Sequence, residues 1–112
     1  MAQEIKPKQV ITYVDVHGNE PYTDWVNGLK DQKSRERIID RIMRLQNGLY
    51  GDCEPVGEGI SELRMFFGAG YRVYFGEDDK NLVILLCGGD KKTQKRDIKA
   101  AKLYWKDFKN EN

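Results

Sequence analysis

The sequence is poor in residues that support metal or disulfide chemistry. Its 112 residues include one histidine, His17, and two cysteines, Cys53 and Cys87, which lie 34 positions apart. A zinc site needs several nitrogen or sulfur ligands, and small disulfide-stabilised domains carry more cysteine pairs than this. We therefore expect no metal site, no small-molecule cofactor and reduced thiols, as in a cytoplasmic protein.

Long apolar runs are also absent. The longest, LVILLC at residues 82–87, is far shorter than the roughly 20 residues of a membrane-spanning helix. The first residues, MAQEIKPKQV, contain lysines but no apolar stretch typical of a secretory signal. With 33% charged and 39% hydrophobic residues, the composition is that of a folded chain rather than a disordered one. We expect a cytoplasmic protein without a membrane partner, folded as a single domain over residues 1–112.

Positive charge is concentrated near the C-terminal end of the chain. The net charge is only +1, but residues 91–109 hold eight basic and two acidic residues, so this segment carries +6 and the remainder −5. Five lysines there recur at steps of four and three and share one face of a predicted helix, namely Lys95, Lys99, Lys102, Lys106 and Lys109. This asymmetry indicates an anionic partner, although a lysine-rich terminal helix also serves solubility alone.

The predicted order of elements is β-α-α-β-β-β-α. Strands are expected over residues 9–16, 60–67, 71–76 and 82–87, and the glycine-rich segment 51–59 is expected to be a loop. Asn19 is the expected cap of a short first helix, Asp31 or Ser34 caps an amphipathic second helix that ends at Gly48, and a third helix covers about 93–109. The fold class is α+β, with a small antiparallel sheet whose last three strands form a meander. Residues 82–87, which lack polar positions, should be the central strand, and residues 9–16 an edge strand.

The turn at residues 68–70 decides which side chains share a face of this sheet. If GAG is a three-residue hairpin loop, Phe67 pairs with Tyr71, and Met65 pairs with Val73. Odd-numbered residues then face the core, and the opposite face gathers Glu62, Arg64, Phe66, Arg72 and Tyr74.

Two interpretations of that face stay open. In one, the two arginines bind phosphates while Phe66 or Tyr74 stacks on bases, so that the face binds nucleic acid. In the other, Glu62 pairs with Arg64 and the aromatic rings cover the arginine stems on a solvated face. The first is favoured by GGDKK after the strand 82–87, which brings Lys91 and Lys92 to the rim of the sheet.

Two stretches of the sequence carry a family resemblance. ISELRMFFGAGYRVYF and LVILLCGGDKKTQKRDIKAAKLYW resemble the RelE/ParE superfamily, the toxins of bacterial type II toxin–antitoxin systems, and are most similar to the HigB-like addiction-module killer proteins. The resemblance covers nearly the whole chain and implies a RelE-like fold. It also implies a toxin that enters the ribosomal A site and cleaves messenger RNA as an endoribonuclease. The implied partners are the ribosome, its message and a cognate antitoxin, which in the HigB-like group usually carries a helix-turn-helix domain. The alternative, from ParE-like members, is inhibition of DNA gyrase through protein binding.

The resemblance also implies roles for individual residues. Arg72 matches the arginine that contacts the scissile phosphate, Arg64 a basic position on the preceding strand, and Lys91 and Lys92 the basic pair that protonates the leaving group or stabilises charge. Metal-independent cleavage through the 2′-OH also needs a base, and Glu62 is the carboxylate on the same face. The expected catalytic residues are thus Arg72, Arg64, Lys91, Lys92 and Glu62, and the expected RNA-binding residues are Phe66, Tyr74, Lys95, Lys99 and Lys102.

Overall fold

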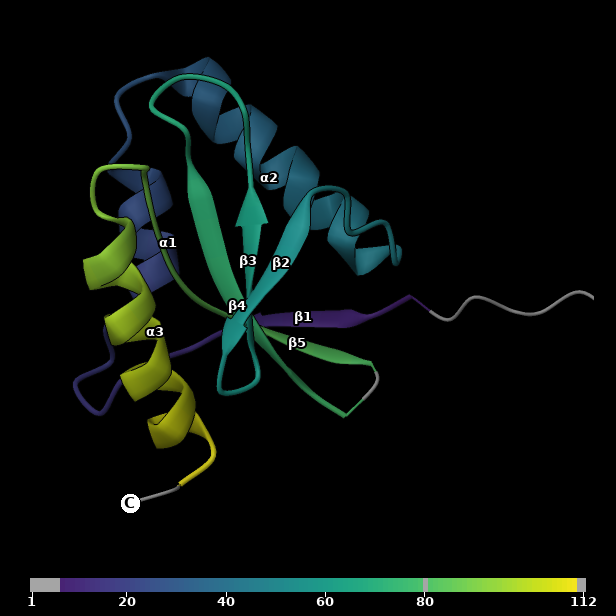
Figure 1. Ribbon diagram of the computed structural model, residues 1–112, viewed down its shortest axis with the longest axis vertical. Coiled ribbons are helices and arrows are strands. Elements are labelled where there is room, and N and C mark those ends of the chain that lie inside the picture. The colour runs from purple at the N-terminus through teal and green to yellow at the C-terminus, as the bar shows by residue number, and fades with distance from the viewer. Residues whose placement is uncertain (1–6, 80, 111–112) are drawn as a thin grey trace, which may run out of the picture.

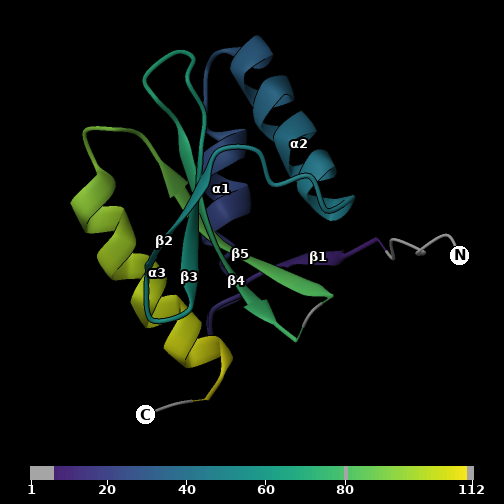
Figure 2. The same cartoon turned by 45° about the vertical axis from the view of Figure 1, so that its right-hand side comes forward.

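The computed structural model describes residues 7–79 and 81–110. Its elements are, in chain order, β1 (Gln9–Thr12), α1 (Pro21–Asn27), α2 (Gln32–Gln46), β2 (Cys53–Gly57), β3 (Ile60–Arg64), β4 (Arg72–Asp78), β5 (Leu82–Gly89) and α3 (Gln94–Phe108). The five strands form one sheet in the order β1-β5-β4-β3-β2, with β1 parallel to β5 and all other neighbours antiparallel. Figure 2 shows α1 and α2 on one side of the sheet and α3 on the other. The predicted α+β class is therefore confirmed.

Each face of the sheet carries its own hydrophobic core. The core beneath α1 and α2 contains the strand residues Leu63, Val73, Phe75, Val83 and Leu85, together with Met65, which follows β3. The core beneath α3 contains the strand residues Ile60, Tyr74, Ile84, Leu86 and Cys87, with Ala101 and Trp105 from the helix. Because successive strand residues point to opposite faces, β4 and β5 supply both cores. These two strands therefore hold the three layers together (Figure 1).

Helix α2 forms as its sequence predicts. Asp31 precedes the first turn, and its carboxylate accepts a hydrogen bond from the Lys33 amide. Gly48 lies just beyond the helix with a φ of +80°, a conformation that favours glycine after a C-terminus. The predicted cap of α1 is wrong by one residue, since Glu20 rather than Asn19 is the N-cap.

The sheet differs from the prediction in three respects. The predicted loop 51–59 contains an extra strand, β2, at the edge of the sheet, where the missing amide hydrogen of Pro55 is tolerated. Strand β1 ends at Thr12 and runs parallel to β5, so the sheet is mixed rather than antiparallel. β1 is an edge strand as expected, but β4 rather than β5 is the middle strand, although β5 is buried as predicted over residues 83–87.

The β3–β4 hairpin is also longer than predicted. Val73 pairs with Leu63 instead of Met65, and the last pair is Arg64 with Arg72. The register is therefore shifted by two residues, and the connection spans residues 65–71. Because a shift of two keeps every side chain on its predicted face, Leu63 and Val73 still face the core beneath α1 and α2.

No helix within residues 7–79 and 81–110 combines the length and the apolar character that crossing a membrane would require.

Gly88 lets α1 pack closely against the sheet. A Cβ atom at this position would overlap the ring of Trp25. We therefore expect Gly88→Ala to lower the free energy of unfolding by about 1–3 kcal/mol through overpacking, as measured by urea denaturation. Gly28→Ala is the control, because Gly28 has a right-handed conformation (φ −81°, ψ −8°) and a Cβ atom there would come no closer than 3.2 Å, to the Asp24 carbonyl oxygen. Equal stabilities of the two variants would contradict the proposed close packing.

Candidate functional site

Four of the predicted basic residues gather at one end of the sheet, which we call the arginine end. Arg64 closes β3 and lies directly opposite Arg72, the first residue of β4. Arg72 in turn pairs with Gly89, the last residue of β5. Lys91 lies two residues further along the chain, and its amide donates to the Ala69 carbonyl of the β3–β4 connection at 3.4 Å. The sheet therefore brings Arg64, Arg72, Lys91 and Lys92 to the same end, as predicted.

The side chain of Arg72 is held between the connection and a buried carboxylate. Its Nη1 donates to the Gly70 carbonyl at 2.7 Å, and its Nε lies 3.6 Å from Oε2 of Glu62. The Nε is buried and has no hydrogen-bond partner, so this nitrogen relies on the ion pair alone. No hydrogen bond to a described residue uses Nη2. Arg72 thus has a fixed direction, with 12% of its side chain exposed.

Glu62 is the anchor of this arrangement. It is 2% exposed, and its Oε2 accepts hydrogen bonds from the Tyr74 hydroxyl and from Nε2 of Gln94, both at 2.9 Å. Burial, together with the bond to this carboxylate, raises the pKa of Tyr74, so the phenol remains a donor. The sequence left open an ion pair between Glu62 and Arg64. That interpretation is wrong, because Glu62 pairs with Arg72 instead. Because Glu62 is screened from solvent, its geometry suits anchoring better than proton abstraction.

Arg64 lies in a more open environment. Its Nε is 3.3 Å from Asp52 and its Nη2 is 3.3 Å from Glu54, with 29% of the arginine side chain exposed. The Asp52 carboxylate raises the pKa of the Arg64 guanidinium still further above its ordinary value. Exposed ion pairs contribute only about 0–1 kcal/mol. A phosphate could therefore displace these carboxylates from Arg64 at small cost, whereas the Arg72–Glu62 pair would stay in place.

The two predicted aromatic residues differ in their exposure to solvent. Tyr74 is completely buried beneath α3, so its predicted stacking on a base is wrong. Phe66 is 81% exposed and lies in the connection after β3 rather than in the strand. Of these two residues, Phe66 is therefore the one that presents its ring to a ligand.

The predicted lysines are spread over the molecule. Lys91, Lys92, Lys95 and Lys99 are exposed, the first two in the turn before α3. Lys102 lies at the opposite end of the sheet, where its ammonium group is close to Gly57 in the β2–β3 hairpin. It is therefore separate from the arginine end.

Sequence reasoning missed the residues that shape this end of the sheet. The Asp90 carboxylate accepts from the amides of Lys92 at 2.8 Å and Thr93 at 3.1 Å, and so folds the lysine turn. An aspartate two residues before an amide is a known turn signal, and DKKT contains it. Gln94 and Asp52 contact their partners across the fold, and no local pattern reveals such contacts.

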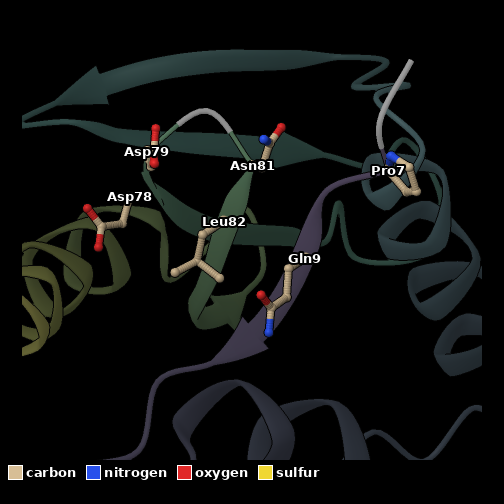
Figure 3. A pocket seen from close by; sticks show the side chains of 6 residues that line it. All are labelled: Pro7, Gln9, Asp78, Asp79, Asn81 and Leu82. Carbon is tan, nitrogen blue, oxygen red and sulfur yellow. The ribbon is translucent and has the colours of Figure 1, made fainter. Parts of the chain in front are cut away.

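The remaining polar features do not suit a polyanion or a metal. Burial raises the pKa of the Cys87 thiol to about 12, so it is not a nucleophile near neutral pH. Within residues 7–79 and 81–110, no three potential metal ligands of the histidine, cysteine or carboxylate type are grouped. A pocket of about 440 Å³ lies by the β4–β5 turn, at the other end of β4 from Arg72. Its lining includes Asp78 and Asp79, whose charge disfavours phosphate (Figure 3).

Comparisons with known proteins identify similar sequences. The sequence model of the family described as "Phage derived protein Gp49-like (DUF891)" matches residues 24–107. An uncharacterized protein of Haemophilus influenzae is 51% identical over 82 residues, which cover 73% of this chain and 83% of that protein. The family match includes all four basic residues of the arginine end.

The Glu62 anchor can be tested by stability. We expect Glu62→Gln to lower the free energy of unfolding by about 2–4 kcal/mol, because it leaves the Arg72 charge largely buried without its counterion. Urea denaturation followed by circular dichroism measures the change.

Glu54→Gln is the matched control for this experiment. It makes the same chemical change at an exposed partner of Arg64, and we expect an effect below about 1 kcal/mol. If the two variants lose equal stability, Glu62 is not the anchor of the arginine end.

Proposed function

We propose that this chain, which belongs to the Gp49-like family of phage-derived proteins, inhibits translation by cleaving messenger RNA on the ribosome. The family consists of toxins of type II toxin–antitoxin systems in the broad RelE/ParE-like sense. Endoribonuclease activity is the finer step of the proposal. It is supported above all by Arg72, whose guanidinium is held in one direction and which lies beside Arg64, Lys91 and Lys92.

The geometry suits cleavage by the RNA's own 2′-OH. Arg72, fixed by Glu62, would bind the scissile phosphate and stabilise the charge that builds on its oxygens in the transition state. Arg64 would bind the same phosphate with a second guanidinium, once its ion pairs with Asp52 and Glu54 are broken. These roles need groups that stay charged, which arginine provides at any physiological pH.

Two proton transfers complete the reaction. Lys91 or Lys92, both exposed on the turn held by Asp90, would donate a proton to the 5′ oxygen as the P–O bond breaks. The proton of the 2′-OH needs an accessible base, and the buried Glu62 is poorly placed for this task. Asp52, 31% exposed, would be freed beside Arg64 when that arginine engages phosphate. We therefore assign the base to Asp52 and keep Glu62 as the positioning residue.

The family implies an antitoxin partner. We propose that it is a helix-turn-helix protein encoded beside the toxin. Co-expression of the native operon with a tag on the toxin should recover both proteins in one complex by size-exclusion chromatography. Recovery of the toxin without any companion would contradict this proposal.

Messenger cleavage tests the proposed activity directly. With translating ribosomes, the wild-type protein should generate new messenger ends that primer extension detects. Arg72→Ala should slow this cleavage by about 100-fold or more, since it removes a donor to the developing charge. Asp52→Asn should also reduce the rate, because it removes the proposed acceptor of the 2′-OH proton.

Controls separate chemistry from folding. Arg72→Lys keeps the charge opposite Glu62 but lacks the planar fork, so it should fold and cleave slowly. Lys106→Ala, at the far end of α3, should cleave normally. Intact messages together with blocked DNA supercoiling by gyrase would instead favour the protein-binding alternative, in which exposed arginines and Phe66 form an interface.

A further inference from the structure

A second basic surface lies on α2, beside the β3–β4 connection. Arg37, Arg41 and Arg44 recur at steps of four and three, so they share one face of the helix. With Asp40 and residues 65–67 they line a groove of about 240 Å³, which we call the α2 groove. The connection lies beside α2 in both views of the fold (Figures 1 and 2).

The arginines of the α2 groove keep their charge available. Arg41 donates to the carbonyls of Arg64 at 2.9 Å and Tyr50 at 3.2 Å, which are neutral acceptors. Arg37 lies over the ring of Phe67, with its guanidinium carbon 5.1 Å from the ring centroid. The exposed side chain of Arg44 has no hydrogen bond or ion pair with any residue the structure describes. With Asp40 as the one acidic lining residue, the groove has a net charge of +2.

Phe66 adds an aromatic surface to this charge. Its ring is 81% exposed at the rim of the groove, while the neighbouring Met65 is buried. Leaving a ring this size in water forfeits the free energy that its burial would contribute. Exposed aromatic rings beside arginines are the combination that binds single-stranded nucleic acid, because bases stack on the ring while guanidinium groups bind phosphates.

The α2 groove also adjoins the proposed catalytic site. Arg41 binds the backbone of Arg64, whose side chain faces Asp52, so the groove and the arginine end meet at one residue. Arg37 and Arg44 are two helical turns apart, or about 10 Å along the axis, which suits a ligand with more than one phosphate. An RNA strand held at Arg64 could extend directly into the groove. This continuity favours RNA over an acidic segment of a protein.

We propose that the α2 groove binds the single-stranded RNA that flanks the cleaved phosphate. Arg37 and Arg44 bind its phosphates, and Phe66 stacks on one of its bases. The inference rests on the proposed function, because it names how the same RNA substrate continues beyond the catalytic site.

Fluorescence anisotropy with a short labelled polyuridine RNA tests the groove in the full chain. We expect Arg44→Gln and Phe66→Ala each to weaken binding about 5- to 10-fold, and Phe66→Trp to preserve it. Arg44→Gln should also reduce the slope of log affinity against log salt by about 0.7, the value for one phosphate on a single strand. Both residues are exposed, so unchanged urea midpoints will show that the variants fold.

Matched controls lie away from the groove. Lys106→Gln removes an exposed cation from α3, on the other side of the sheet from α2, and Val16→Ala trims an apolar side chain that is 89% exposed. Both should bind the RNA as the wild type does. If they weaken binding as much as the groove variants, the RNA has no specific path along α2 and the inference is overturned.

Ribosome assays separate this inference from the proposed function. If the wild type cleaves messages and the groove variants bind and cleave equally well, the inference fails while the proposed function stands. If the wild type neither binds RNA nor cleaves messages, the proposed function fails and the inference falls with it. If the groove variants keep RNA affinity but lose the co-purifying partner, the groove docks a protein and the inference is wrong.

Discussion

The ion pair between Glu62 and Arg72 connects the fold with its site. A carboxylate that is 2% exposed is tolerated because Tyr74 and Gln94 donate hydrogen bonds to one of its oxygens and Arg72 forms an ion pair with the same oxygen. These partners come from β4 and from the first turn of α3, so packing of the helix and orientation of the arginine depend on each other. Loss of the pair would therefore loosen the α3 layer and the arginine end together. The neighbouring Arg64 shows the contrast, since Glu54 is exposed and Asp52 is only half-buried, so that solvent or a phosphate can replace them.

Local patterns in the sequence predicted most of the architecture. The apolar period of α2, the cap at Asp31 and the glycine at position 48 all describe that helix correctly. Strand alternation placed Leu63 and Val73 on the correct face even though their partners were wrong by two residues. Alternation is insensitive to such a shift, whereas register depends on the loop, where Met65 and Tyr71 form one more backbone hydrogen bond. Strand β2 was missed because proline and glycine usually mark a loop, and only its place at the sheet edge makes them acceptable.

The predicted positions of the candidate residues were correct where strand ends determine them and wrong where tertiary packing does. Arg64, Arg72 and Lys91 come together because they lie at the ends of neighbouring strands. Tyr74 was placed on the correct face but is buried, since alternation cannot tell how far α3 extends over the sheet. The sequence predicted α2 as an amphipathic helix but assigned no function to its arginines. Their approach to the β3–β4 connection is a long-range contact, and no period within α2 encodes it.

The edge of the sheet formed by β2 affects how other protein chains can pair with this one. An edge strand offers unpaired backbone groups that can template the addition of a foreign strand. In β2 the ring of Pro55 removes one donor, and the exposed Glu54 adds charge beside it. Both features make this edge a poor template for pairing with another strand. A partner that adds a strand to the sheet would therefore pair more readily with β1, the strand at the opposite edge.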